Sequence, residues 1–226
     1  MTRVLAINGS ARMERGKTDL LLKAFLEGMT DAGAEVELVY ASRLKVEPCV
    51  GEFHCWNDAP GECFIKDSMQ GLYPKLKAAD TWVLGTPMYV PLPGDMQNLL
   101  NRTCPLIMPK LVTRGGRTRA RTRPDVRTRR LALVATSGWW EVGNMGTLVR
   151  IAEELAKDLS IEYAGALLRP HAAMMTTAEG PTKRGRRVLE AARAAGRQLE
   201  TRGRMDPRTL RAVSMPLLSR KEYLEG

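Results

Sequence analysis

Short apolar runs that alternate with amphipathic helical patterns constrain the fold of this 226-residue chain more than any other feature. Residues 4–7 and 36–40 predict two strands, and residues 18–31 between them have the apolar spacing of a helix that closes at Gly33. Further strands are expected at residues 81–87, 131–136 and 161–168, and further helices at residues 67–78, 93–101, 145–159 and 182–202. The alternation predicts an α/β protein with one five-stranded parallel sheet and helices on both faces.

Ligands of such sheets bind beyond the carboxyl ends of the strands, so the loops after the first, third and fourth strands are the candidate sites. The first loop contains Gly9, Ser10, Arg12, Lys17 and Thr18 directly before the first helix. A flexible backbone, hydroxyl donors, two cations and a helix N-terminus together suit a phosphate group. The spacing matches neither a P-loop nor a GxGxxG turn, and an ordinary polar loop is the alternative.

The other two loops offer walls for a flat ring. Met88 and Tyr89 follow the third strand in a proline-rich segment, and Gly138 with Trp139 or Trp140 follows the fourth. Local packing of these side chains is the alternative for each loop. A phosphate cradle and two ring-binding walls at one end of one sheet are the arrangement that FMN requires.

Three segments resemble the NADPH-dependent FMN reductase and iron–sulfur flavoprotein group of the flavodoxin-like fold: residues 9–18, 85–102 and 136–140. The similarity extends from residue 2 to about residue 168, without the arginine-rich stretch. It implies the strand order 2-1-3-4-5 and a set of FMN-binding residues, with Lys17 where the family more often has Asn. These residues are Ser10, Arg12, Gly16, Lys17 and Thr18 at the phosphate, Pro87, Met88 and Tyr89 along the isoalloxazine, and Thr136, Ser137, Gly138 and Trp139 at its far edge.

The connection over residues 42–66 holds three of the four cysteines, Cys49, Cys55 and Cys63. It resembles the cluster-binding stretch of iron–sulfur flavoproteins, but Glu52 stands where that family has its second cysteine. Because a four-iron cluster usually needs four thiolates, we expect no cluster. Zinc with His54 or Glu52 as the fourth ligand stays open, although the C-x5-C-x7-C spacing is not a standard zinc pattern. We expect no bound metal, and free thiols in a loop that caps the flavin and contributes to a homodimer or homotetramer.

The net charge of +10 is concentrated in the second half of the chain, with eight arginines within residues 114–130. That stretch shows no apolar periodicity, which predicts a solvated, mobile insertion. Nucleic-acid binding is the less favoured interpretation of these arginines, and attraction of NADPH or an anionic acceptor is another. Residues 1–204 are expected to form the FMN-binding domain, with insertions at about 42–66 and 108–130. Residues 205–226 are expected to form a tail that wraps along a neighbour or a partner subunit.

These observations predict an FMN-dependent NAD(P)H oxidoreductase that reduces a quinone, a flavin, an azo or nitro compound, or a metal ion. No catalytic side chain is required, because the cofactor carries the chemistry. The alternatives are a flavodoxin-like electron carrier without nicotinamide activity and a basic flavoprotein associated with nucleic acid. No apolar stretch of membrane-spanning length and no signal-peptide pattern occur in the sequence, so we expect a cytoplasmic protein without a membrane partner.

Overall fold

A five-stranded parallel sheet forms the centre of the computed structural model, which describes residues 1–225. The strand order is β2-β1-β3-β6-β7, which confirms the predicted 2-1-3-4-5 order of the five alternating strands. The strands of this sheet are β1 (Arg3–Asn8), β2 (Glu35–Tyr40), β3 (Thr81–Pro87), β6 (Arg130–Thr136) and β7 (Glu162–Arg169).

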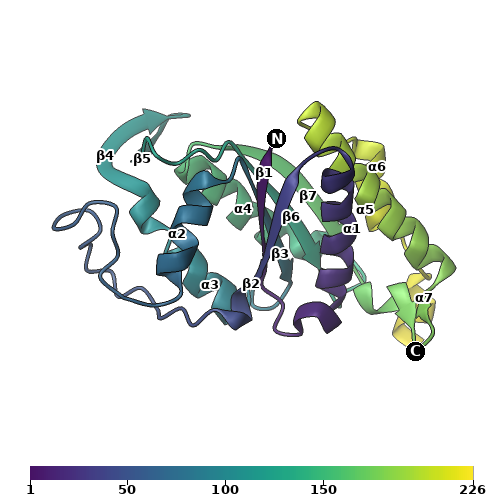
Figure 1. The fold of residues 1–226 in the computed structure, drawn as a ribbon. Coiled ribbons are helices and arrows are strands. Elements are labelled where there is room, and N and C mark those ends of the chain that lie inside the picture. The colour runs from purple at the N-terminus through teal and green to yellow at the C-terminus, as the bar shows by residue number, and fades with distance from the viewer. Residues whose placement is uncertain (226) are drawn as a thin grey trace.

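Helices cover both faces of the sheet (Figure 1). The helices α1, α5 and α6 pack on one face, and α2, α3 and α4 pack on the other. Their bounds are α1 (Lys17–Asp31), α2 (Met69–Ala78), α3 (Gly94–Asn101), α4 (Gly146–Asp158), α5 (Lys183–Arg202), α6 (Pro207–Ser214) and α7 (Arg220–Glu225). Among the helices within residues 1–225, none combines the length and the apolar character that crossing a bilayer requires.

Alternate residues of β1 supply the two halves of the core. Val4 and Ala6 belong to the cluster under α1 and α5, whereas Leu5 and Ile7 belong to the cluster under α2, α3 and α4. Successive strand residues point to opposite faces, so a continuous apolar run is required when both faces are covered. The two-sided core therefore follows directly from the apolar composition of the strand.

Two glycines let α1 and α5 lie unusually close to each other. A Cβ atom added at Gly28 would lie 1.9 Å from the carbonyl oxygen of Arg193, and one at Gly196 would lie 1.9 Å from that of Phe25. Neither position tolerates a side chain without separation of the helices. One glycine on each helix, Gly28 of α1 and Gly196 of α5, thus sets the distance between the two helices.

The arginine-rich stretch is folded, which corrects the prediction of a mobile insertion. Its first part forms an antiparallel hairpin of β4 (Ile107–Arg114) and β5 (Arg117–Thr122). Gly115 and Gly116 form the turn with φ values of 55° and 70°, as a two-residue hairpin turn requires. The arginines of β5 occupy alternate positions and therefore share one face, and Ala120 is the one apolar residue on the other, so the apolar alternation that reveals most strands is missing from this sequence.

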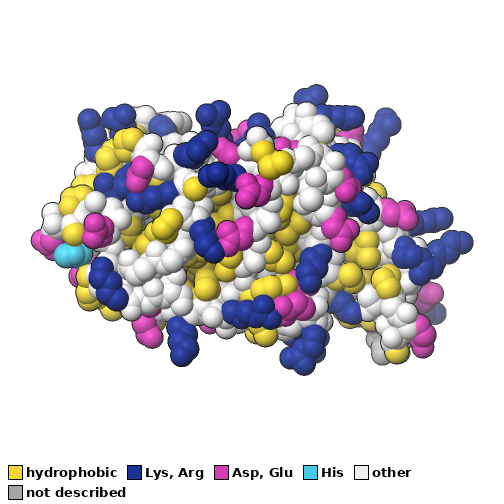
Figure 2. All heavy atoms as spheres, viewed as in Figure 1, with side chains coloured by type: hydrophobic (Ala, Val, Ile, Leu, Met, Phe, Trp, Pro, Cys, Tyr) yellow, Lys and Arg dark blue, Asp and Glu magenta, His cyan; other side chains and the backbone are white. Residues whose placement is uncertain are grey.

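The hairpin is held by α4. The guanidinium of Arg119 forms ion pairs with Glu154, at 2.6 Å, and with Asp158. The hydroxyl of Thr122 donates a hydrogen bond to the carbonyl of Leu159 at 2.5 Å. Figure 2 shows Lys and Arg side chains spread over the visible face and interleaved with Asp and Glu. On this face, the positive charge therefore does not form a single basic patch.

Residues 205–225 pack on their own chain. The fully buried guanidinium of Arg169, at the end of β7, donates to the carbonyls of Val213 at 2.8 Å and Met215 at 2.9 Å. The segment also contains α6 and α7, which the sequence did not predict. A further short hairpin, β8 (Thr176–Thr177) and β9 (Gly180–Pro181), precedes α5. Within the chain, α6 packs against β7 and α5. Contact of this segment with a partner subunit stays a prediction.

Candidate cofactor site

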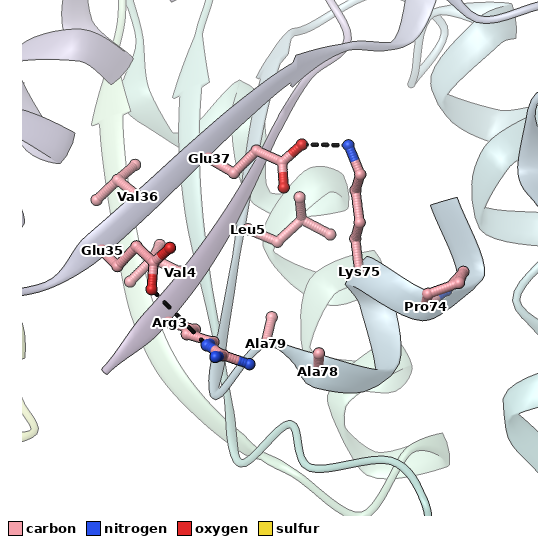
Figure 3. A pocket seen from close by; sticks show the side chains of 10 residues that line it. All are labelled: Arg3, Val4, Leu5, Glu35, Val36, Glu37, Pro74, Lys75, Ala78 and Ala79. Atoms are coloured by element: carbon pink, nitrogen blue, oxygen red, sulfur yellow. Dashed lines mark hydrogen bonds and ion pairs between the residues drawn. The ribbon is translucent and has the colours of Figure 1, made fainter. Parts of the chain in front are cut away.

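The cavity drawn in Figure 3 lies at the wrong end of the sheet for a ligand site of this fold. It has a volume of about 330 Å³ and lies between the first residues of β1 and β2 and the end of α2. Ion pairs of Arg3 with Glu35, at 3.7 Å, and of Lys75 with Glu37 cross it. Ligands of parallel sheets bind at the opposite, carboxyl ends of the strands, where the three predicted loops lie.

The loop after β1 forms a tight cradle. The side chain of Asn8 accepts a hydrogen bond from the amide of Ser10 at 2.9 Å, and the carbonyl of Ser10 accepts one from the amide of Met13 at 2.9 Å. A Cβ atom at Gly16 would lie 2.8 Å from the Ser10 hydroxyl oxygen. Ser10 is buried beneath the loop, so the absence of a side chain at Gly16 is what allows this curled conformation.

The first turn of α1 faces this cradle with its amides uncapped. Its N-cap residue is Gly16, and no side chain accepts a hydrogen bond from the amides that follow. The side chain of Arg12 is exposed, and Lys17 donates from its ammonium group to the hydroxyl of Thr176. Free helix amides and nearby cations form an environment that stabilises an anion.

Two predicted residues from different loops meet in the interior. The hydroxyl oxygens of Thr18 and Thr136 lie 2.7 Å apart, and both residues are buried. One hydroxyl must donate to the other, so one O–H group of the pair still has its hydrogen available for a ligand. This contact links the first loop to the loop after β6.

Asp19 organises a polar network below the cradle that the sequence analysis missed. Its buried carboxylate accepts hydrogen bonds from Asn8 at 3.1 Å and from Tyr40 at 2.8 Å, and pairs with Lys23 at 2.8 Å. Burial and the bond to Asp19 raise the pKa of Tyr40, while the bond to Asp19 raises the pKa of Lys23. The acidic residue in the first turn of α1 was the available signal for this network.

The loops after β3 and β6 lie against each other. The amide of Met88 donates to the carbonyl of Thr136 at 2.7 Å, which extends the pairing of Pro87 with Thr136 at the strand ends. Beyond this contact, the side chains of Tyr89 and Trp139 are 51% and 60% exposed. Two large aromatic side chains are thus accessible at the same edge of the sheet, as a ring-binding site requires.

The third loop is held by a hydrogen bond within the loop and by others from distant segments. The hydroxyl of Ser137 accepts from the amide of Trp139 at 2.9 Å, and the carbonyl of Ser137 accepts from the amide of Ala172 at 2.9 Å. The hydroxyl of Tyr223 in α7 donates to the carbonyl of Gly138. Residues far apart in the sequence therefore position Ser137, Gly138 and Trp139.

The two neighbouring tryptophans have different environments. Whereas Trp139 is exposed, Trp140 is half-buried and stacks on His171, with a centroid distance of 6.1 Å and an angle of 12°. Burial and the nearby Arg169 lower the pKa of His171, so its ring is neutral at neutral pH. Trp140 therefore belongs to the support of the loop, and the sequence analysis did not identify His171.

All four cysteines line one cavity of about 330 Å³ on the α3 side of the molecule. Cys49, Cys55 and Cys63 are close in the sequence, and the structure adds Cys104, which lies two residues after the resemblance segment that ends at residue 102. Burial raises the pKa of Cys55 and raises the pKa of Cys104 to about 12. Within residues 1–225, no three His, Cys, Asp or Glu side chains converge closely enough to hold a single metal ion.

Comparison with solved structures identifies the same architecture elsewhere. An NAD(P)H:quinone oxidoreductase from Methanothermobacter marburgensis superposes with a TM-score of 0.62 at 16% identity, over 88% of this chain and 96% of the other. An FMN-dependent NADH-azoreductase from Bacillus anthracis, solved in complex with FMN, superposes with a TM-score of 0.61 at 14% identity, over 89% and 100% of the two chains. At these identities, the similarity establishes the flavodoxin-like fold alone.

Sequence comparison adds closer relatives. An iron–sulfur flavoprotein of Methanocaldococcus jannaschii is 32% identical over 105 residues, which are 46% of this chain and 53% of the relative. One from Archaeoglobus fulgidus is 31% identical over 102 residues, 45% of this chain and 48% of the relative. The chain thus spans about half the length of the curated relatives it matches. The family model described as NADPH-dependent FMN reductase matches residues 2–145, well over half of the chain. The chain belongs to the NADPH-dependent FMN reductase family.

Proposed function

We propose that this protein is an FMN-dependent NAD(P)H oxidoreductase that passes electrons to a small-molecule acceptor. The observation that carries the proposal is the convergence of the loops after β1, β3 and β6 at one edge of the sheet in a member of this family. The uncapped start of α1 and the exposed Tyr89 and Trp139 provide two different environments there. These environments suit an anionic phosphate and an aromatic ring, respectively.

The FMN phosphate would bind in the cradle formed by Ser10, Gly16 and the first turn of α1. Arg12 and Lys17 would supply positive charge, and the spare hydroxyl hydrogen of the Thr18–Thr136 pair would donate a hydrogen bond. A phosphate at a helix N-terminus gains from both the free amides and the helix dipole. The residues present therefore fit the phosphate end of the cofactor.

The isoalloxazine ring would lie between the two remaining loops. Pro87, Met88 and Tyr89 would line it on one side, and Ser137, Gly138 and Trp139 would meet its far edge. The hydrogen bond from Met88 to Thr136 fixes the separation of these loops. Because Tyr89 and Trp139 are accessible, the same edge can admit a nicotinamide and then an acceptor in turn.

When bound, FMN supplies hydride acceptance from a nicotinamide and electron transfer to an acceptor, so the protein needs no general acid or base. The protein's own part is to bind and orient the reactants. Quinones and azo compounds are the acceptor classes that the names of the structurally similar enzymes suggest. Flavins, nitro compounds and metal ions remain in the predicted set. A homodimer or homotetramer and a cytoplasmic location stay predictions.

Absorbance spectroscopy of the purified protein tests the proposal. We expect the protein to bind FMN on titration, and its flavin absorbance to bleach when NADPH or NADH is added without oxygen. A quinone or an azo dye should then restore the absorbance. A flavodoxin-like carrier would instead resist NADPH and NADH and bleach only with dithionite. Failure to bind FMN at all would refute the proposal.

A further inference from the structure

The cavity lined by the four cysteines is assembled from two segments that are distant in the sequence. Cys49, Cys55 and Cys63 lie in the connection between β2 and α2, and Cys104 lies in the short 3-10 helix after α3. Cys55 and Cys63 are buried, Cys104 is half-buried and Cys49 is exposed. Cys55 and Cys104 lie close enough that each thiol contributes to the shifted pKa of the other. Every cysteine of the chain is therefore at this one place.

Hydrogen bonds that involve no thiol hold the two segments together. The indole of Trp56 donates to the carbonyl of Cys104 at 3.3 Å. The guanidinium of Arg123 donates to the carbonyl of Pro105 at 2.8 Å and to that of Cys55 at 3.2 Å. The four thiols are thus brought together by the fold itself. A site that is organised before its ligand arrives loses less entropy on binding.

A buried cation with an unpaired N–H group lines the same cavity. Arg102 is 1% exposed, and its two terminal nitrogens bond to Asp67 and to the carbonyls of Glu47 and Ile65, at distances of 2.7–3.3 Å. Its Nε atom has no hydrogen-bond partner. A buried unpaired donor is costly, and more so on a charged group. An anionic ligand that reached Nε from the cavity would satisfy this donor.

We infer that Cys104 supplies the fourth thiolate of a four-cysteine iron–sulfur centre and takes the role that Glu52 leaves vacant in the local cysteine motif. Free thiols were expected because only three cysteines lie close together in the sequence, and Cys104 is remote from them. With Cys104 included, the donor set matches the four thiolates that a [4Fe–4S] cluster requires. The complete centre carries a negative charge, which the positive charge of Arg102 partly compensates.

The arrangement favours a cluster over a single zinc ion. Zinc places its thiolate ligands about 2.3 Å from one point, and no such convergence of three ligating side chains occurs within residues 1–225. The four cysteines instead line a cavity of about 330 Å³. Glu52, which also lines the cavity, accepts a hydrogen bond from the amide of His54 at 3.3 Å and so has a partner within its own loop.

Anaerobic transfer of a preformed [4Fe–4S] cluster with four small thiolate ligands tests the inference without FMN turnover. Each cysteine thiol gives its proton to a departing small thiolate as its sulfur binds iron, so no electrons are exchanged. After desalting, we expect about four iron and four sulfide per chain. In the loaded protein, all four cysteines, Cys104 included, should resist alkylation as measured by mass spectrometry.

Variants locate the fourth ligand. Cys104→Ser should retain about ten-fold less iron, and Glu52→Cys in that background should restore it, because position 52 also lines the cavity. Three results would overturn the inference: no cluster retained by the wild-type chain, Cys104 alkylated at the same rate with and without cluster, or a single zinc ion retained from Zn²⁺ alone while the cluster is not. The alkylation result needs no variant, so it stands even where Cys104→Ser fails to fold.

Discussion

Gly16 shows how one residue can determine the geometry of a binding loop. Its missing side chain leaves room for the Ser10 hydroxyl, and it leaves the first amides of α1 without a side-chain acceptor. The resemblance alone predicts Gly16 as a residue of the phosphate loop. The structure adds a physical reason, which is that any Cβ atom here would displace Ser10.

The contribution of Arg12 to FMN binding can be distinguished from that of the nearby Arg15. Both side chains are exposed. Arg12 precedes the 3-10 helix Met13–Arg15, and Arg15 is the last residue of that helix. We expect Arg12→Ala to weaken FMN binding about ten- to a hundred-fold, since a hydrogen bond to a charged group contributes about 1.5–3 kcal/mol. Fluorescence titration of FMN measures the effect. Arg15→Ala is the matched control, and an equal loss in both variants would contradict a specific role of Arg12.

Among the structural elements, the β4–β5 hairpin differs most from the sequence prediction, which was a mobile insertion instead of two paired strands. Strand prediction depends on one apolar and one polar face, and arginines replace that pattern here. The hairpin exists because the two glycines form its turn and because α4 presents Glu154 and Asp158 to Arg119. The second of these causes cannot be recognised before the chain is folded.

Removal of the Arg119 side chain should therefore loosen the hairpin and leave the sheet intact. We expect Arg119→Ala to increase amide hydrogen exchange across β4 and β5, with little change in β1, β3 or β6. Arg121→Ala is the control, because Arg121 is an exposed arginine of the same strand. Equal exchange in the two variants would show that the ion pairs with α4 do not hold the hairpin.

In the whole molecule, His171 links the loop after β6 to the C-terminal segment. Its Nε2 atom accepts from the amide of Leu217 at 3.1 Å and lies 3.1 Å from an Arg169 nitrogen, while Trp140 stacks on its ring. Protonation of Nε2 would remove the acceptor and place a second positive charge beside Arg169. The C-terminal segment should thus be sensitive to acid.

The sign of this pH dependence follows from the lowered pKa of His171, which results from burial first and Arg169 second. Below about pH 6.5, the unfolded chain binds a proton at this residue before the folded chain does. Stability should fall as the pH decreases from about 6.5 toward the folded pKa. We expect His171→Gln to show a smaller decrease in melting temperature between pH 7 and pH 5, by about 2 °C or more. His54→Gln, which changes the chain's other histidine, should behave like the wild type.

Exposed apolar side chains at the carboxyl edge of the sheet bear on assembly. Val90 is fully exposed beside Tyr89, and Trp139 lies across from them on the third loop. If copies of the chain associate through this edge, Val90→Asp should reduce the mass in sedimentation velocity by about half or more. Leu111→Asp on the hairpin, at another exposed apolar position, should leave the mass unchanged. An unchanged mass in Val90→Asp would place any interface elsewhere.

The sequence by itself determined the five core strands, their order by resemblance, and the three loops at their carboxyl ends. Local periodicity encodes these features, because a strand buried on both faces must be apolar throughout and a helix must repeat every 3.6 residues. The candidate roles of Ser10, Met88 and Trp139 followed from that framework, and that of Gly16 from the resemblance.

Only the tertiary structure decided which distant residues meet. The contact of Thr18 with Thr136, the burial of Arg169 under the C-terminal segment, and the arrival of Cys104 beside Cys55 depend on how whole elements pack. No local pattern specifies such contacts, since each joins segments separated by dozens of residues. The candidate phosphate loop was therefore recognisable from the sequence, whereas the four-cysteine cavity became visible only after folding brought its two segments together.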